Sequence, residues 1–253
     1  AARVQADRPG QRVVGDYTAL AAAPEIDLVV IASPNDSHHA LARAALSAGK
    51  HVVVDKPFTV TLAQAGDLVA LAGVQQRLLS VFHNRRWDGD FLSLREQVDG
   101  GALGEVRELI SRFDRFDPLP RDRWRERAGP GAGLWFDLGP HLIDQALCLF
   151  GAPATVQADL ACLRDGAQAD DFAQVVLGYP QRRITLHCTR LAAHAGARFE
   201  AHGTRGSFHC EGLDIQEHQL RGGTAPGSPG FGEDPRPVWV TDGSAATLTA
   251  RAV

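Results

Sequence analysis

The stretch that decides the fold is residues 27–57, DLVVIASPNDSHHALARAALSAGKHVVVDKP. It opens with the apolar run 27–32, which is typical of a strand buried on both faces. Residues 36–48 carry apolar side chains at helical spacing and stop at Gly49, and a second apolar run follows at residues 51–54. Strand, helix and strand at this spacing predict a right-handed crossover between parallel strands.

The same alternation continues along the chain. Residues 61–73 predict a second helix, with Thr59 or Thr61 as its N-cap, and residues 78–82 predict a third strand. We therefore predict an α/β domain with a doubly wound parallel sheet, over residues 1–86.

The pattern changes after residue 86. Residues 91–99 predict one more helix, and alternating segments rich in Val, Ile, Phe and Thr then predict strands at 105–116, 155–163, 172–179, 183–191 and 197–210. Such a series is typical of an α+β domain with a mostly antiparallel sheet, predicted over residues 87–253. Its exposed sheet face is a candidate surface for a homo-oligomer, a dimer or a tetramer. Residues 221–237, which hold many Gly and Pro, predict a mobile loop.

Composition excludes several partners. The formal net charge of −4 argues against nucleic acid, because phosphate binding needs a basic surface. No run approaches the roughly 18 apolar residues of a membrane helix, so no membrane partner is expected. The cysteines are far apart and predict reduced core thiols of a cytoplasmic protein: Cys148, Cys162, Cys188 and Cys210. The chain holds no methionine, which predicts that it starts inside a longer protein.

Lys56 stands at the carboxyl end of the second strand, in Asp55-Lys56-Pro57. Open α/β sheets bind ligands at this end of their strands. A partly desolvated ammonium there can transfer a proton or hold an oxyanion, and Pro57 restricts the lysine backbone and could be cis. The alternative is a strand-ending charge before a turn proline.

Two polar loops follow the neighbouring strands. Residues 33–38 follow the first strand and residues 83–88 follow the third. Short polar side chains at a helix N-terminus suit a nucleotide, because free N–H groups bind its hydroxyls or phosphates. An ordinary helix cap by Asn35, Asp36 or Ser37 is the alternative.

Residues 131–150 predict a helix that places Asp137, His141 and Asp144 on one face. A carboxylate beside a histidine orients the imidazole and raises its basicity, as a general base requires. The alternative is a capped helix with a satisfied core histidine, and Pro140 favours it because proline often starts or kinks a helix. A metal site is less favoured, since no further ligands are evident nearby.

Asp55-Lys56-Pro57 after an apolar strand resembles the E-K-P signature of the glucose–fructose oxidoreductase / inositol dehydrogenase / rhizopine catabolism (Gfo/Idh/MocA) family, with Asp in place of Glu. Other similar motifs lie at residues 34–38, 49–52, 101–106 and 133–144, and the resemblance spans most of residues 16–215. The likeness is greatest to a bacterial subgroup carrying H-N-R-R-W-D and R-D-R-W-R, here residues 83–88 and 121–125.

The resemblance implies roles for individual residues. Lys56 matches a lysine that hydrogen-bonds substrate and nicotinamide ribose, His141 matches the general acid/base, and Asp137 matches the aspartate that assists it. The implied cofactor contacts are Ser33, Pro34, Asn35, His38, Asp55, Lys56, Pro57, Asn84 and Arg85. Lys56 and His141 also contact the substrate. Arg123 and Trp124 are further candidates, for an acidic or stacked sugar group, although arginines in a loop are more often solvated.

The implied protein is a Rossmann-type oxidoreductase that uses NAD or NADP on a sugar, cyclitol or related polyol. Lys56 would stabilise the developing alkoxide. The family's G-x-G-x-x-G is not in these 253 residues, so the resemblance implies that a βαβ unit lies upstream or is missing, and that further helices close the family's fold. The chain is then either a fragment or a reduced protein that cannot hold its cofactor in the usual way. Two other classes stay open: a non-catalytic NAD(P)-binding sensor of the same fold, and a metal-dependent hydrolase or lyase using Asp137, His141 and Asp144.

Overall fold

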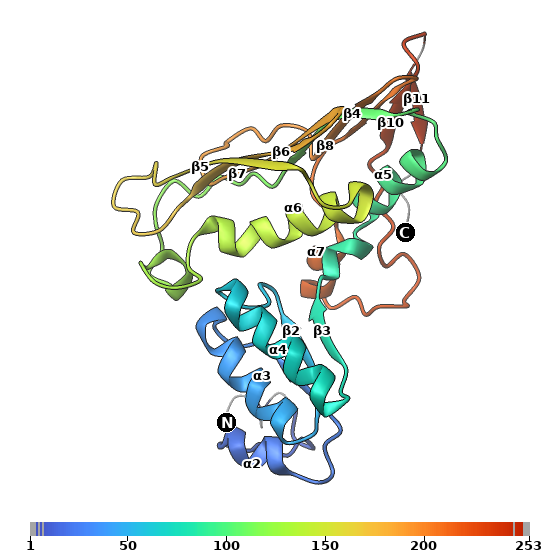
Figure 1. Cartoon of the computed structure of the whole chain (residues 1–253). Helices are drawn as coiled ribbons and strands as arrows, with labels where there is room; N and C mark the ends of the chain where they lie inside the picture. The colour runs from blue at the N-terminus through green and yellow to red at the C-terminus, as the bar shows by residue number, and fades with distance from the viewer. Residues whose placement is uncertain (1–3, 5, 7, 245, 250–253) are drawn as a thin grey trace. The chain divides into compact units, whose positions relative to one another are not determined.

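The computed structural model describes residues 4, 6, 8–244 and 246–249, the last four in backbone only. The chain divides into two compact units, Ala1–Phe82 and His83–Val253, and each is described by itself (Figure 1). The predicted domain boundary, after residue 86, lies slightly further along the chain.

The first unit holds a three-stranded parallel sheet in the order β1-β2-β3. The strands are β1 (Leu28–Ile31), β2 (His51–Asp55) and β3 (Leu79–Phe82). The parallel sheet predicted from the alternation of apolar runs and helices is thereby confirmed.

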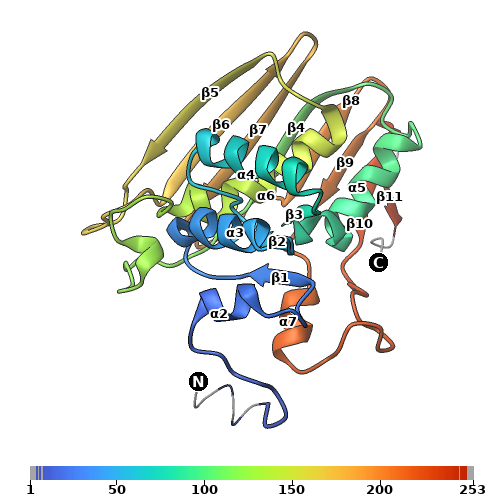
Figure 2. The ribbon, with the colours of Figure 1, turned by 60° about the horizontal axis from the view of Figure 1, so that its bottom comes forward.

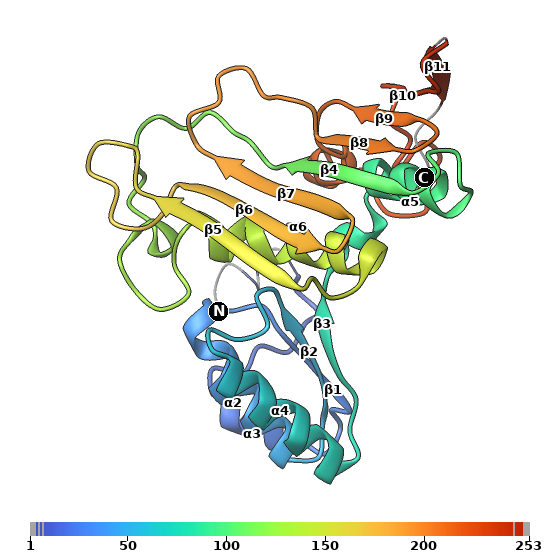
Figure 3. The same ribbon diagram turned by 45° about the horizontal axis from the view of Figure 1, so that its top comes forward.

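The helices that accompany these strands in the described part of the chain are α2 (Tyr17–Ala22), the short η1 (Asn35–Ser37), α3 (His38–Ser47) and α4 (Leu62–Gln75). Thr61 caps α4, because its side chain accepts a hydrogen bond from the Gln64 N–H at 3.2 Å. Figures 1 and 3 show α3 and α4 side by side on one face of the sheet, and their apolar residues form one core with Val29, Ile31 and the matching residues of β2.

Burial of β1 differs from the prediction. Val29 and Ile31 are 5% and 3% exposed, whereas Leu28 and Val30 are 50% and 65% exposed. The prediction that this strand is buried on both faces is wrong within the described chain. Both crossover helices lie on the same face because the strand order advances in one direction with right-handed connections.

The second unit is built on an eight-stranded sheet in the order β11-β10-β9-β8-β4-β7-β6-β5. All neighbours are antiparallel except β4 and β7, so the predicted, mostly antiparallel sheet is confirmed. Figure 2 shows most of its strands side by side. The strands are β4 (Val106–Arg112), β5 (Thr155–Ala161), β6 (Phe172–Tyr179), β7 (Arg182–Thr189), β8 (Phe199–Gly203), β9 (Ser207–Cys210), β10 (Val238–Thr241) and β11 (Ala246–Thr249).

Helices α5 (Gly89–Asp99) and α6 (Leu134–Phe150) cover one face of this sheet, and Figure 3 views the opposite face. Their apolar residues join those of the strands in a single core. Pro140 lies inside α6, so the helix does not start there as the proline suggested. Short helices complete the unit: η2 (Asn84–Trp87), η3 (Trp124–Glu126) and α7 (Gln216–Arg221).

The start of α6 is fixed by a residue from outside the helix. The backbone carbonyl of Asp170 accepts a hydrogen bond from the Leu134 N–H at 2.7 Å. The side-chain Oδ2 of Asp170 accepts another from the Trp135 N–H at 2.6 Å. Gly133, with φ of 98°, is required next to it, since a Cβ there would lie 1.9 Å from Asp170 Oδ1. This anchor sets the direction in which α6 presents its polar face.

One other expectation, on the cysteines, needs correction. The predicted core location of the cysteines holds for Cys188 and Cys210, but Cys148 and Cys162 are exposed. Burial raises the pKa of Cys188 to about 12. No helix within the described residues combines the length and apolar character needed to cross a membrane.

Candidate active site

In the first unit, the candidate residues lie where β1 and β2 end. Lys56 directly follows β2 and is half-buried, and the Lys56–Pro57 peptide bond is cis. The Asp55 carboxylate accepts a hydrogen bond from the Lys56 N–H at 2.8 Å. Asp55 therefore holds the backbone of the lysine.

His38 connects these two strand ends. It is fully buried, with Nδ1 2.8 Å from the Pro57 carbonyl oxygen and Nε2 3.0 Å from the Ser33 carbonyl oxygen. Carbonyl oxygens only accept, and a neutral imidazole has one N–H to donate. Both ring nitrogens of His38 thus face carbonyl oxygens of the two loops, and a neutral ring donates a hydrogen bond to one of them.

The loop after β1 is held by its own side chains. Ser33 Oγ lies 2.6 Å from Ser37 Oγ, Ser37 Oγ donates to the Pro34 carbonyl at 2.6 Å, and Asn35 is buried. Neither Ser37 at the start of α3 nor Pro34 at the start of η1 makes a side-chain cap. The alternative of an ordinary helix cap is therefore not supported for Ser37.

In the second unit, Asp137, His141 and Asp144 lie on one face of α6, but they have different partners. His141 is 4% exposed. The Asp144 carboxylate accepts hydrogen bonds from Arg86 Nη2 at 2.6 Å and from Arg86 Nε at 2.8 Å. Asp137 instead lies 3.6 Å from Arg125 Nε and 3.6 Å from Arg190 Nη2.

These partners bear on the metal alternative. Asp144 is committed to an arginine, which repels a cation. Across the ranges that the structure describes, no group of three or more His, Cys, Asp or Glu side chains could hold a metal ion. The hydrolase or lyase class therefore has no observation in its favour.

A buried aromatic ring, Phe113, lies at the centre of this part of the unit. The His141 ring stacks on it with centroids 6.4 Å apart and planes 25° apart. Three guanidinium carbons also lie over the same ring, those of Arg85 at 4.8 Å, Arg115 at 5.2 Å and Arg198 at 5.4 Å from its centroid. Phe113 therefore lies against both the candidate base His141 and three arginine side chains.

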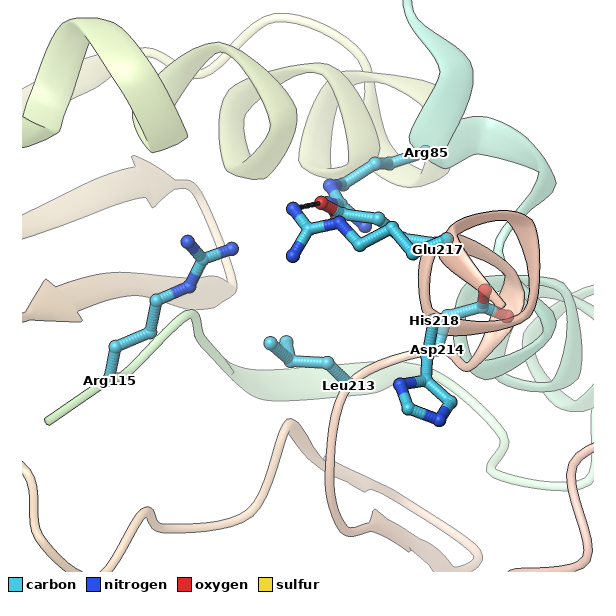
Figure 4. A pocket seen from close by; sticks show the side chains of 7 residues that line it. Arg85, Arg115, Leu213, Asp214, Glu217 and His218 are labelled. Carbon is cyan, nitrogen blue, oxygen red and sulfur yellow. Dashed lines mark hydrogen bonds and ion pairs between the residues drawn. The ribbon is translucent and has the colours of Figure 1, made fainter. Parts of the chain in front are cut away.

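Two of these arginines open onto a cavity of about 200 Å³. Its walls are Arg85, Arg115, Leu213, Asp214, Glu217, His218 and Arg221. Figure 4 shows Arg115 across the cavity from Arg85 and Glu217, with its guanidinium directed toward them. Arg85 Nη2 donates to Glu217 at 3.1 Å and its Nη1 to Asp88 at 3.0 Å.

Asp88 has an unusual environment. Burial, together with the nearby carboxylates of Asp90 and Asp214, raises its pKa to about 7 despite the ion pair with Arg85. Burial and the neighbouring Arg190 lower the pKa of Arg115. Charges in this region are therefore poorly solvated, which strengthens electrostatic interactions with any bound group.

The remaining predicted residues are also in the second unit. Asn84 is exposed on η2, and Arg85 lines the cavity. Arg123 Nε is bonded to Glu126 at 2.6 Å, and the half-buried Trp124 lies under the guanidinium of Arg125 at 4.5 Å.

Sequence reasoning missed the buried Phe113 and the cavity residues Arg115 and Glu217. The first two follow a recognisable strand, so the alternation of aromatic and charged residues just beyond β4 was an available signal. Glu217 had no such signal, because its partner Arg85 is distant in the sequence.

Comparison with known proteins identifies the family. A family model described as the oxidoreductase family, NAD-binding Rossmann fold, matches residues 1–83, and the GFO/IDH/MocA C-terminal domain matches residues 91–209. The uncharacterized oxidoreductase YdgJ of Escherichia coli (strain K12) is 56% identical over 234 residues, covering 92% of this chain and 68% of that protein. A crystal structure of a Klebsiella pneumoniae protein assigned as an oxidoreductase has a TM-score of 0.91 and 50% identity, covering 99% of this chain and 70% of that one.

The chain therefore belongs to the Gfo/Idh/MocA oxidoreductase family, whose first domain is an NAD-binding Rossmann fold. The scyllo-inositol 2-dehydrogenase (NADP(+)) IolW of Bacillus subtilis (strain 168) is 36% identical over 231 residues, covering 91% of this chain and 64% of that protein. The chain thus spans about two thirds of the length of these curated relatives.

Proposed function

We propose that the protein transfers hydride between NAD or NADP and a hydroxyl-bearing or carbonyl carbon of a cyclitol, sugar or related polyol. Family membership and the named scyllo-inositol dehydrogenase relative support this proposal. The observation that carries it is the buried His141 on α6, with Asp137 one turn before it. A histidine shielded from water, with a carboxylate at this spacing, has the arrangement of a general acid/base.

The residues at the ends of β1 and β2 fit a nicotinamide cofactor. They are the half-buried Lys56 and the polar loop of residues 33–38. The buried His38 ring lies between the carbonyl oxygen of Ser33 in that loop and that of Pro57, next to Lys56. When bound, the nicotinamide would supply the hydride chemistry. In this proposal His141 accepts the proton of the substrate hydroxyl, Asp137 orients it, and the Lys56 ammonium stabilises the developing alkoxide.

The first test is Lys56→Ala, assayed by nicotinamide reduction over a polyol panel. Removal of an oxyanion donor costs about 100- to 1000-fold in kcat in other enzymes, and we expect a loss of that order. Lys50→Ala is the matched control, since Lys50 is the chain's other lysine and binds the Ala23 carbonyl at 2.7 Å. Near wild-type turnover of Lys56→Ala would remove this lysine from the mechanism.

The second test is His141→Asn, with His187→Asn as control. His187 also contacts an aspartate, Asp114, at 2.8 Å, but it lies on β7 away from α6's polar face. We expect His141→Asn to lower kcat by about 100-fold or more and to abolish the pH dependence that a general base produces. An unchanged pH profile would contradict the assignment. Binding of cofactor without turnover of any polyol would favour the sensor class instead.

We also propose that the protein is a cytoplasmic homo-oligomer associating through the second-unit sheet. Support comes from the sheet face opposite α6, over which Figure 3 shows no helix of the described chain. Sedimentation equilibrium measures the assembly, and a monomer at all concentrations would exclude it.

A further inference from the structure

Arg115 is the cavity residue whose guanidinium has no carboxylate in contact with it in the described chain, although Asp137 and Glu217 attract it from further away. Its guanidinium carbon lies over the Phe113 ring, 5.2 Å from the centroid. Among the residues that the structure describes, none forms an ion pair or side-chain hydrogen bond with this guanidinium. Arginine presents five donors in a planar fork, and half-buried arginines usually meet an anion.

The two carboxylates of the cavity already have partners. Glu217 is bonded to Arg85 at 3.1 Å and to Arg221 at 2.5 Å. Asp214 accepts from the backbone N–H of Gly89 at 2.7 Å and of Gln216 at 2.8 Å. Of the three arginines that line the cavity, Arg85 and Arg221 each contact a carboxylate, and Arg115 is the one that contacts none.

The cavity is close to the candidate base. Both the Arg115 guanidinium carbon and the His141 ring lie within 6.4 Å of the centre of Phe113. Because both groups pack on the same buried ring, a ligand held by Arg115 lies in the same part of the second unit as His141. The cavity therefore suits a part of the substrate other than the reacting carbon.

We propose that this cavity binds a carboxylate of the substrate through Arg115, and that the substrate is an acidic sugar or cyclitol. This inference rests on the proposed function and narrows its substrate class. The Arg115 guanidinium, which has no carboxylate in contact, carries one positive charge. That charge matches a monoanionic carboxylate, whereas a phosphate dianion would leave one negative charge in excess.

Arg115 replaces Arg123 and its neighbours in residues 121–125 as the candidate for binding an acidic group of the substrate. Arg123 is bonded to Glu126 at 2.6 Å, and Arg121 is paired with Asp117. Arg125 lies over Trp124 and 3.6 Å from Asp137. The guanidinium groups of all three arginines therefore already contact other side chains of the protein.

The test uses matched substrate pairs: sugar and cyclitol acids, each with its neutral counterpart, for example D-glucuronate and D-glucose. D-glucose 6-phosphate forms the phosphate arm. The wild type is compared with Arg115→Gln, Arg115→Lys and the control Arg182→Gln, which loses a guanidinium over Phe150 at 4.6 Å, outside the cavity. Nicotinamide reduction gives kcat and KM, calorimetry without cofactor gives binding, and thermal denaturation verifies folding.

We expect the wild type to prefer the acid of a pair. Arg115→Gln should raise the KM of the acid about 10- to 100-fold, the range expected for a charged hydrogen-bonded contact, with little change in kcat or in the KM of the neutral counterpart. Arg115→Lys should recover part of the loss because it keeps the charge without the fork. Arg182→Gln should behave as wild type.

Other results separate the two proposals. Equal use of acids and neutral polyols, unaffected by Arg115→Gln, overturns the carboxylate site and leaves the oxidoreductase proposal intact. Acid binding that Arg115→Gln abolishes, with no nicotinamide reduction by any compound, supports the site and overturns the proposed function. A preference for the phosphate overturns the assignment to carboxylates.

Discussion

Replacing Arg198 by methionine tests how the second unit holds a buried charge beneath its candidate site. Arg198 is 2% exposed and Asp90 is 0% exposed, and Arg198 Nε lies 3.2 Å from Asp90 Oδ2. The guanidinium also donates to Ser111 Oγ at 2.8 Å and to Gln145 Oε1 at 2.8 Å. Gln145 lies one turn beyond His141 on α6, so Arg198 links the strands to this helix.

The size of the effect follows from the geometry. At 3.2 Å and an effective dielectric constant of about 20, the Coulomb attraction is about 5 kcal/mol. Breaking a buried pair by removing one partner costs about 3–5 kcal/mol, because the remaining charge is left in a medium that solvates it poorly. We therefore expect Arg198→Met to lower the free energy of unfolding by about 3–5 kcal/mol.

Urea denaturation measures this difference, and two further variants test its cause. The double variant Asp90→Leu/Arg198→Met removes both charges, so it should regain part of the stability that Arg198→Met loses. Arg182→Met removes an arginine that lies over Phe150, and it should cost less than about 1 kcal/mol. A loss below about 1 kcal/mol in Arg198→Met, or a double variant no more stable than it, would refute the reasoning.

Three other changes have definite expected outcomes. Thr61→Ala removes the cap of α4 and should cost about 1 kcal/mol in urea denaturation, whereas Thr59→Ala should cost less. Gly203→Ala places a Cβ 2.0 Å from the Leu103 carbonyl oxygen, so its thermal midpoint should fall well below that of wild type; an unchanged midpoint would show that this approach relaxes easily. Burial and the nearby carboxylates of Asp90 and Asp214 raise the pKa of Asp88 from its ordinary value of 3.8 to about 7 in the folded protein. The fold therefore binds that proton more tightly, and its stability falls as pH rises from about 4 to about 7. Asp88→Asn should flatten that dependence, and equal slopes in both proteins would show that Asp88 does not cause it.

Much of the fold was predictable because its signals are local. The Thr61 cap, the apolar runs and the Gly-bounded helices each indicate their own element. Helix α7 and strand β10 were missed because distant contacts stabilise them. Gln219 of α7 bonds to the Gly230 carbonyl at 2.8 Å, and Trp239 of β10 pairs with His209 of β9.

The candidate site divides in the same way. Helical spacing placed Asp137, His141 and Asp144 on one face of α6, as the structure has them. It could not indicate that Arg86 holds Asp144, or that Arg115 faces a cavity, because those relations depend on tertiary packing. Residue type and spacing suggested the chemistry, whereas the packing decided which charges remain available.

The position of Phe113 has a consequence for how this protein could evolve. Its ring contacts the candidate base on one side and guanidinium groups on others, including Arg115 of the cavity. Under the roles proposed for His141 and Arg115, a substitution at this position is expected to alter substrate selection and proton transfer together, since both side chains lie against this ring. Adaptation to a substrate of different charge is expected to proceed through the cavity arginines, and Phe113 is the residue least open to gradual change.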